Sequence, residues 1–151
     1  MSRWRFRIVA ETGPFRLDVD VQGDTSVVAV VGANGSGKTT LLRAIAGAIA
    51  LEAAEVAVDG EVLESTSSAT RVPIELRRVG YVPQGYGLFP HLSVLDNVGF
   101  GLARGLSPLG RGERMVRAQG VLDALGYGEL ASRRVGSLSG GEQQAVALAR
   151  A

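Results

Sequence analysis

Residues 27–39 read Val-Val-Ala-Val-Val-Gly-Ala-Asn-Gly-Ser-Gly-Lys-Thr, and this stretch decides the fold. Its first part, Val27 to Val31, is a continuous apolar run rich in β-branched residues, which is typical of a strand buried on both faces of a parallel sheet. Lys38 to Ala48 is predicted to form a helix, because apolar residues recur at helical spacing from Leu41 onward. A buried strand, a glycine-rich loop and a helix in this order predict an α/β fold.

The loop between them, Gly32 to Thr39, matches the pattern G-x-x-x-x-G-K-[ST] of a phosphate-binding loop. Glycines let backbone N–H groups turn inward around phosphates, and the start of the helix adds its positive dipole end. Lys38 is expected to reach the β- and γ-phosphates, and the Thr39 hydroxyl to ligate Mg²⁺. The alternative is an ordinary glycine turn. The predicted ATP-binding residues are Gly32, Ala33, Asn34, Gly35, Ser36, Gly37, Lys38, Thr39 and Thr40.

Lys38 is the only lysine among the 16 basic residues. This count indicates a position that suits a compact ammonium rather than a guanidinium fork, although an arginine-rich coding bias would leave the same count.

Composition excludes several classes of function. A net charge of +1, from 16 basic and 15 acidic residues, gives no reason to expect a nucleic acid as partner. The absence of cysteine excludes a disulfide framework, a thiolate metal site and a cysteine nucleophile. The apolar stretch Ala44 to Leu51 is too short to cross a bilayer, and no secretory signal follows the basic start. We therefore expect one soluble, cytosolic domain.

Short antiparallel strands are predicted on either side of the loop. Apolar and charged residues alternate over Arg3 to Arg7 and Phe15 to Val21, which predicts a hairpin. A second hairpin is predicted from Glu55 to Leu63, because Asp59-Gly60 suits the positive φ angles of a tight turn. Ser65 to Thr70 is then expected as a polar loop, and Val79 to Val82 as a short strand closed by Pro83.

From about residue 88 to residue 137 the pattern becomes mostly helical, and we interpret this segment as an insert. Ser93-Val-Leu-Asp96 resembles a capping box that starts a helix running to about Leu102. A second helix is predicted over Arg111 to Leu125, ended by Gly126. A final helix is predicted over residues 141–151, directly after a serine and two glycines.

This last start, Leu138-Ser-Gly-Gly-Glu-Gln-Gln144, is a second helix N-terminus that could accept an anion. The alternative is a plain N-cap by Ser139.

Taken together, these segments make the chain resemble the nucleotide-binding subunit of ABC transporters, in which a phosphate-binding loop is followed by a glutamine loop and an L-S-G-G-Q-like signature. Gly32 to Thr39, Tyr81-Val-Pro-Gln84 and Leu138 to Gly141 occur here in that order. The resemblance covers nearly the whole chain, from about Phe6 to Ala151. Within the family, residues 80–84 and 88–98 look most like importers for molybdate, sulfate, iron or polyamines, with the molybdate type foremost.

The resemblance implies an ABC-type nucleotide-binding domain with a P-loop core and antiparallel β subdomain over residues 1–87, a helical insert over 88–137, and the signature with its helix over 138–151. It implies ATP and Mg²⁺ as cofactors and a homodimer that clamps two ATP molecules. The signature residues Ser139, Gly140, Gly141 and Glu142 would contact the ATP of the other subunit.

For the remaining site residues the resemblance implies catalytic roles for Lys38 and Gln84, and metal contacts by Thr39 and Gln84. Gln84 would also report the nucleotide state, through the helical insert, to transmembrane permease subunits. The subunit would then lie at the inner face of the membrane. It is thereby expected to be a transport ATPase.

The sequence departs from the family pattern at three places. The aromatic residue that stacks on adenine would fall near Thr12-Gly13, which is not aromatic, so Phe15 is a substitute candidate, and the alternative for Phe15 is a core phenylalanine. Ala145 stands where many relatives carry arginine after the signature. His91, the sole histidine, lies in the insert and cannot be the family's late switch histidine.

The sequence stops at Ala151, before the strand ending in Asp-Glu that the family uses for its second metal contact and general base. The resemblance therefore implies a copy that is incomplete at the C-terminus and inactive as given. Two alternatives stay open: a catalytically silent nucleotide-binding fragment, and a soluble ABC-type ATPase of DNA repair or translation.

Overall fold

The computed structural model describes residues 3–102 and 110–151, which form two compact units, Met1–Arg78 and Val79–Ala151. Residues 103–109, which belong to the predicted helical insert, lie outside the described part. Each unit is described by itself.

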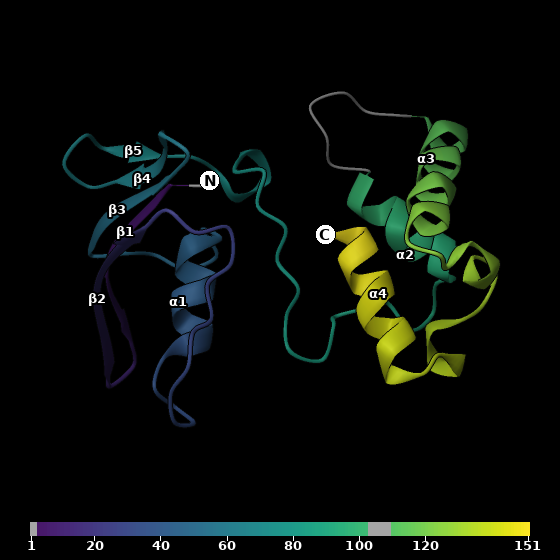
Figure 1. The fold of residues 1–151 in the computed structure, drawn as a ribbon, viewed down its shortest axis with the longest axis horizontal. Coiled ribbons are helices and arrows are strands. Elements are labelled where there is room, and N and C mark those ends of the chain that lie inside the picture. The colour runs from purple at the N-terminus through teal and green to yellow at the C-terminus, as the bar shows by residue number, and fades with distance from the viewer. Residues whose placement is uncertain (1–2, 103–109) are drawn as a thin grey trace. The chain divides into compact units, whose positions relative to one another are not determined.

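The first unit is an antiparallel sheet with one helix against it (Figure 1). Strand β1 (Trp4–Thr12) pairs with β2 (Phe15–Gly23) across a turn at Gly13, as the sequence predicted. The sheet order is β2-β1-β3-β4-β5. The other strands are β3 (Ala53–Val58), β4 (Glu61–Ser65) and β5 (Thr70–Arg71). The short helical turn η1 (Ile74–Leu76) follows.

The predicted hairpin around Asp59-Gly60 is confirmed, with φ angles of 52° at Asp59 and 84° at Gly60. Both residues of the turn therefore adopt the left-handed conformation that a two-residue hairpin of this type needs.

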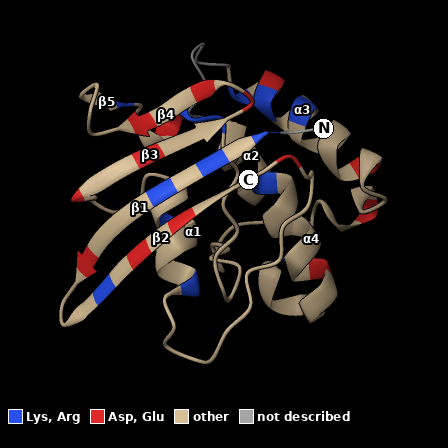
Figure 2. Ribbon diagram, turned by 60° about the vertical axis from the view of Figure 1, so that its left-hand side comes forward, with Lys and Arg blue, Asp and Glu red and all other residues tan. Residues whose placement is uncertain are grey.

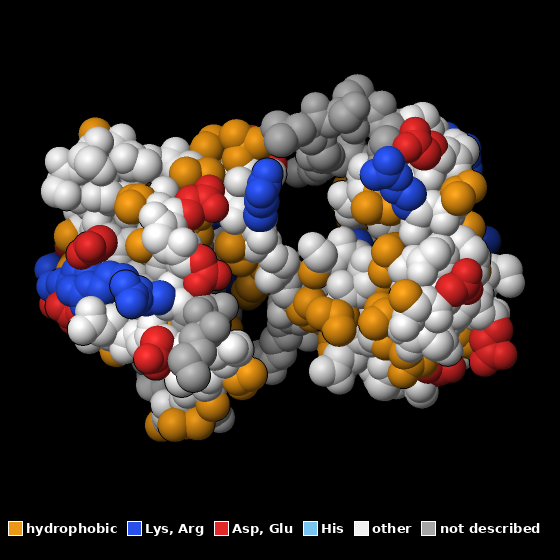
Figure 3. Space-filling view, turned by 45° about the horizontal axis from the view of Figure 1, so that its top comes forward, with side chains coloured by type: hydrophobic (Ala, Val, Ile, Leu, Met, Phe, Trp, Pro, Cys, Tyr) orange, Lys and Arg blue, Asp and Glu red, His pale blue; other side chains and the backbone are white. Residues whose placement is uncertain are grey.

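The two faces of the sheet differ because residues along a strand alternate between them. One face packs on helix α1 (Lys38–Ile45) and forms the core of the unit. Its buried residues are Ile8, Leu17, Leu41, Ala44, Val56 and Leu63. The other face carries a basic stripe on β1 beside acidic residues of β2 (Figure 2), and charges of both signs lie side by side there (Figure 3). Arg5 pairs with Asp20 and Arg7 with Asp18. The hydrogen bond from Arg5 holds the pKa of Asp20 below its ordinary value.

A buried ion pair fixes the far end of α1. Arg77, 3% exposed, pairs with Glu64, 6% exposed. Its Nη1 donates to the carbonyl oxygens of Ile45 at 3.0 Å and Ala44 at 3.5 Å. A cation at this position also complements the negative end of the helix dipole. Arg77 therefore joins the C-terminal end of α1 to the sheet through β4.

The predicted strands at Val27–Val31 and Val79–Val82 are wrong. Neither segment is part of a described strand, and Val27 and Val31 are 86% and 87% exposed. The reason is that a strand exists through its hydrogen-bonded neighbours, whereas the five described strands pair only with one another, all antiparallel. No parallel ladder forms among the described residues.

The second unit is helical. Helices α2 (Val94–Gly101), α3 (Arg111–Ala124) and α4 (Gly140–Arg150) share a core with the turn η3 (Gly128–Leu130), and η4 (Val135–Ser137) precedes α4. The buried core residues include Val94, Val98, Ala118, Leu122, Leu130 and Val146.

The helix boundaries confirm the local sequence signals of this unit. The side chain of Ser93 accepts a hydrogen bond from the backbone N–H of Asp96 at the start of α2. Gly126 follows α3 with a φ of 79°, so the chain leaves the helix in the left-handed conformation that glycine allows.

Candidate functional site

Two glycines with positive φ shape the loop before α1. Gly35 has a φ of 80° and Gly37 a φ of 90°, both in the left-handed region that side chains disfavour. Gly37 also lacks room, because an added Cβ would lie 2.7 Å from Phe15 Cζ and 3.1 Å from Leu17 Cδ1. The β1–β2 hairpin therefore presses directly on the loop, and only glycine fits at Gly37.

The first turn of α1 leaves backbone donors available for an anion. The N-cap residue is Gly37, which has no side chain to accept a hydrogen bond, and the first intrahelical bond runs from the Leu41 N–H to the Gly37 oxygen at 2.8 Å. The N–H groups of Lys38, Thr39 and Thr40 precede that bond. Helix α1, which lies wholly within the described residues, has no acidic residue in its first turn. An anion would bind there without competition from a carboxylate.

The amine of Lys38 lies inside the curve of its own loop. Its Nζ donates to the carbonyl oxygens of Gly32 at 2.9 Å and Ala33 at 2.7 Å. The Ser36 N–H also donates to the Ala33 oxygen, at 3.2 Å, so the loop is closed by its own polar groups. Carbonyl oxygens are neutral acceptors, and a phosphate would be a stronger, charge-assisted partner for the same ammonium.

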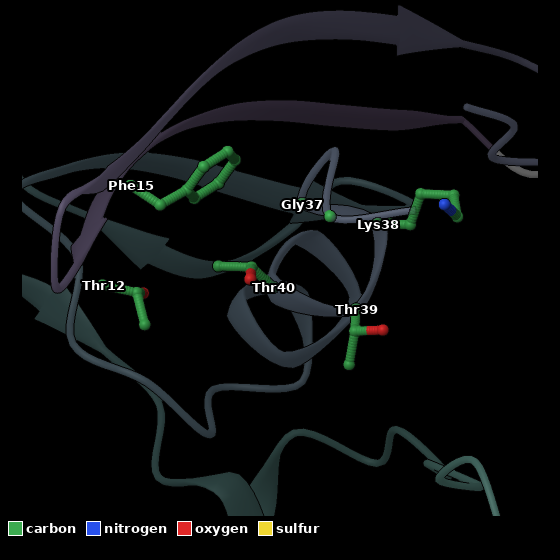
Figure 4. Close-up of a pocket in the computed structure, with 7 residues that line it drawn as sticks. Thr12, Phe15, Gly37, Lys38, Thr39 and Thr40 are labelled. Atoms are coloured by element: carbon green, nitrogen blue, oxygen red, sulfur yellow. The ribbon is translucent and has the colours of Figure 1, made fainter. Parts of the chain in front are cut away.

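A pocket of about 240 Å³ lies at this loop, within the first unit (Figure 4). It is lined by Thr12, Phe15, Gly35, Gly37, Lys38, Thr39 and Thr40. The ring of Phe15 forms part of its wall and also packs against the core, so the core position predicted for this residue is confirmed. Of the other predicted loop residues, Gly32 and Ala33 hold Lys38, and Asn34 is exposed.

The residues available for a metal are few. No group of three or more histidine, cysteine or acidic side chains that could hold a metal ion occurs within residues 3–102 and 110–151. The hydroxyl-bearing Thr39 does line the pocket beside Lys38. Mg²⁺ at nucleotide sites is commonly held by one or two protein ligands together with phosphate oxygens and water. The donor set at the loop fits a metal that arrives with a nucleotide.

Gln84 belongs to the second unit, where it begins an exposed turn, Gln84–Gly87, that we call the glutamine turn. Three successive residues of this turn have positive φ: Gly85 at 78°, Tyr86 at 64° and Gly87 at 58°. A tyrosine in this region is unusual and needs support from its surroundings.

The signature segment forms the N-terminus of α4. Ser139 is the N-cap, and its hydroxyl and the carboxylate of Glu142 form a complete capping box. The Ser139 backbone N–H donates to Glu142 Oε2 at 2.6 Å, and the Ser139 hydroxyl donates to the same oxygen at 2.6 Å. These bonds, with that of the hydroxyl largest, hold the pKa of Glu142 below its ordinary value. Gly140 and Gly141 are exposed beside them.

Among the described residues, no helix has both the length and the apolar character needed to cross a membrane.

Comparison with known proteins agrees with this arrangement. Residues 17–151 match the sequence profile of the family described as ABC transporter. The chain is 43% identical over 139 residues to the molybdenum import ATP-binding protein ModC of Paramagnetospirillum magneticum, covering 92% of this chain and 37% of that protein. It is 39% identical over 147 residues to the molybdate/tungstate import ATP-binding protein WtpC of Archaeoglobus fulgidus, covering 97% and 57%.

Solved structures give the same result. A nucleotide-free ATP-binding cassette from an ABC transporter superposes with a TM-score of 0.77 at 27% identity, covering 99% of this chain and 64% of that one. A dimeric post-hydrolysis cassette bound to ADP and phosphate gives a TM-score of 0.70 at 26% identity, covering 99% and 68%. The chain spans less than two thirds of the length of the curated relatives named above.

The fold and the loop thus define an α/β nucleotide-binding domain of the P-loop class, with an antiparallel β subdomain and helices. The chain belongs to the ABC transporter family.

Sequence reasoning missed several polar residues that organise the second unit. Asn97 is fully buried, and Arg150 contacts the glutamine turn from the end of α4. The signal for Asn97 was weak, since it lies between Asp96, in the first turn of the helix, and the buried Val98. For Arg150 no local pattern existed.

Proposed function

We propose that residues 32–40 bind ATP with Mg²⁺, and that the chain is part of the ATP-binding subunit of an importer that uses ATP hydrolysis for transport. The observation that carries the proposal is the pocket at the loop. Lys38, Thr39 and Phe15 line it together, and the first turn of α1 leaves the backbone N–H groups of Lys38, Thr39 and Thr40 outside the bonds of the helix. The importer role is supported by the names of relatives such as ModC and WtpC.

In the proposed site, the ammonium of Lys38 exchanges its two carbonyl partners for the β- and γ-phosphates. The N–H groups of Lys38, Thr39 and Thr40 bind phosphate oxygens at the positive end of α1. Thr39 would supply one hydroxyl ligand to Mg²⁺, and the metal would neutralise charge on the phosphates. Phe15 offers an aromatic face for the base. Gln84 orients the attacking water or contacts the metal.

Hydrolysis in this proposal requires two subunits. Ser139, Gly140, Gly141 and Glu142 of one subunit face the nucleotide held by the loop of the other, and the exposed start of α4 is accessible for such a contact. The dimeric form of one similar cassette supports this arrangement. Transmembrane permease subunits at the inner face of the membrane are the further partners, reached through the glutamine turn and the helical insert.

The transported solute in this proposal is molybdate or a similar small oxyanion. Relatives named for molybdenum or for molybdate and tungstate import support it. A relative from Pseudomonas fluorescens named for Fe(3+) import, 47% identical over 127 residues, supplies the competing solute.

Two measurements test the proposal. Titration calorimetry of the protein with ATP and Mg²⁺ should show saturable binding, and a protein that binds no ATP would contradict the nucleotide site. Uptake of molybdate and of ferric iron is then compared in host cells with and without the gene. Loss of molybdate uptake alone supports the solute, whereas loss of iron uptake alone replaces molybdate by iron.

A further inference from the structure

The backbone of the glutamine turn is strained, and residues outside the turn hold it in place. Its three successive positive φ angles include that of Tyr86, a residue type that avoids this region. The internal bonds of the turn are the Tyr86 N–H to the Pro83 oxygen at 2.9 Å and the Gly87 N–H to the Gly85 oxygen at 2.7 Å. Strained backbone of this kind persists where surrounding contacts over-determine it.

Arg150, at the last residue of α4, supplies such contacts. Its Nη1 donates to the Gly87 carbonyl at 2.7 Å and its Nη2 to the Tyr86 carbonyl at 3.1 Å. The planar guanidinium therefore spans two adjacent carbonyl groups of the turn with two parallel donors, a geometry that a lysine cannot reproduce. Desolvation by burial lowers the pKa of Arg150 from its ordinary value, so these hydrogen bonds form in partly dry surroundings.

The guanidinium is itself held in place by Phe89. Its carbon lies 5.3 Å from the centre of the Phe89 ring, a cation–π contact. The backbone of Phe89 is fixed by the fully buried Asn97 of α2, which accepts from the Phe89 N–H at 2.8 Å and donates to the Phe89 oxygen at 3.1 Å. The Phe89 ring also meets the edge of Phe100, with centroids 4.7 Å apart. Residues of helix α2 thus orient the Phe89 ring, against which the Arg150 guanidinium packs.

A close helix contact completes the arrangement. Gly101, the last residue of α2, approaches α4 so tightly that an added Cβ would overlap the carbonyl oxygen of Arg150. The ends of α2 and α4 therefore meet at the residue that holds the glutamine turn.

From this geometry we propose that Arg150 is a positioning residue: it fixes the glutamine turn and ties Gln84 to helix α4, whose opposite end is the signature segment Ser139-Gly140-Gly141. The functional meaning of this tie rests on the function proposed above. Because the turn and α4 are joined at Arg150, a displacement of the signature helix is transmitted to Gln84 through two hydrogen bonds. The signature segment and the glutamine turn then move together.

The first test is amide hydrogen exchange measured by NMR, which needs no nucleotide. Arg150→Met keeps an unbranched side chain that can fill the space of the arginine stem, and it removes both donors. We expect the amides of Tyr86 and Gly87 to exchange on the order of tenfold faster, while the core amides of α2 and α3 keep their protection. Arg117→Met is the matched control, since Arg117 lies on α3 with 57% exposure and pairs only with Glu113 in the described structure. Unchanged exchange at Tyr86 and Gly87 in folded Arg150→Met protein would overturn the proposal.

A second pair of variants moves Arg150 without removing it. Gly101→Ala displaces the end of α4, whereas Gly120→Ala places a methyl group on α3 where nothing lies within 4 Å. Faster exchange in the glutamine turn with Gly101→Ala but not with Gly120→Ala supports the tie between α4 and the turn. Equal effects of the two substitutions would overturn it.

The third test measures the effect of Arg150 on ATP turnover. In the full-length subunit of which this chain is proposed to be part, Arg150→Met should lower kcat for ATP hydrolysis on the order of tenfold with KM changed less than about twofold, because nucleotide binding belongs to the loop in the other unit. In a Gln84→Ala background the same substitution should change kcat less than about twofold, because its effect passes through Gln84. If the losses of kcat caused by Arg150→Met and Gln84→Ala were additive, the proposal that Arg150 acts through Gln84 would be overturned. A wild-type protein that binds no ATP would overturn the proposed function instead, and the exchange measurements would still decide the role of Arg150.

Discussion

Replacing Gly37 by alanine tests how the phosphate-binding loop is held against the β1–β2 hairpin. Gly37 has a φ of 90°, and an added Cβ would lie 2.7 Å from Phe15 Cζ and 3.1 Å from Leu17 Cδ1. Gly35, in the same loop, has a φ of 80°, and an added Cβ there meets nothing within 4 Å. The two substitutions therefore separate backbone strain from lack of space.

The magnitudes follow from these two effects. A left-handed conformation costs an alanine roughly 1–2 kcal/mol, so Gly35→Ala should lower the free energy of unfolding by about that amount. Gly37→Ala carries the same strain and must also displace the Phe15 ring, for which overpacking costs about 1–3 kcal/mol more. Phe15→Leu in the Gly37→Ala background should recover part of the loss, because it removes the ring atoms that clash.

Fluorescence of Trp4, the only tryptophan, follows urea unfolding of the unit that contains both glycines. Wild type, Gly35→Ala, Gly37→Ala, Phe15→Leu and the combined Gly37→Ala/Phe15→Leu variant are compared without nucleotide, so that only the fold of the loop is measured. Equal destabilisation by Gly37→Ala and Gly35→Ala would refute the reasoning. So would strictly additive effects of Gly37→Ala and Phe15→Leu, because residues in contact are expected to be coupled.

Four further predictions concern the site and its supports. Lys38→Ala should remove detectable ATP binding in calorimetry, since each charge-assisted hydrogen bond contributes about 1.5–3 kcal/mol. Ser139→Arg should leave ATP binding by the monomer intact while abolishing ATP-dependent dimerisation, measured by light scattering. Glu142 has a pKa lowered from 4.5, so its stabilising effect should be present above that pH and be lost as pH falls through the lowered pKa. Thermal melts of wild type and Glu142→Gln should therefore differ at neutral pH and converge in acid. Arg77→Met leaves the buried Glu64 with only the exposed Arg71, whose Nε lies 3.7 Å from Glu64 Oε1, and should cost up to about 3–5 kcal/mol of unfolding free energy in the Trp4 assay.

Controls for these variants come from exposed neighbours. Arg43→Ala in the last turn of α1 removes an exposed cation, and Ser132→Arg and Arg78→Met repeat the serine and arginine substitutions at exposed positions, so all three should have little effect. The reasoning would fail if Lys38→Ala kept its ATP affinity, or if Ser139→Arg lost monomer binding. A difference in melting that did not depend on pH would contradict the role of Glu142. A loss of under about 1 kcal/mol in Arg77→Met would show that the buried pair is dispensable.

The elements that the sequence predicted correctly are those whose signals act on their own backbone. Asp59-Gly60 adopts the two positive φ angles of its turn, and Gly126 follows the end of α3 with positive φ. Ser93 caps α2 through Asp96, only three residues away. Each of these features is determined by residues within one turn of chain, so a single sequence suffices to place it.

Interactions between distant residues could not be predicted in this way. Val27–Val31 has the composition of a buried strand, but composition does not say which strands will pair with it, and the described strands do not. Arg77 and Glu64 are 13 residues apart, and Arg150 lies 63 residues from Gly87. No periodicity links such pairs, because the fold and not the spacing brings them together.

The two helix starts that sequence patterns mark as anion sites differ in charge, and this difference bears on how a shared nucleotide site would assemble. The first turn of α1 has Gly37 as its cap and no acidic residue, so its N–H groups can donate directly to a phosphate. The first turn of α4 already holds the carboxylate of Glu142, which bonds both the hydroxyl and the N–H of Ser139. A phosphate can contact Ser139 only by exchanging with that carboxylate, whose negative charge opposes it. In the function proposed above, α1 therefore binds the nucleotide first. Helix α4 of the second subunit binds afterwards, when contacts between Ser139 and the bound phosphate replace the capping-box bonds that Ser139 loses.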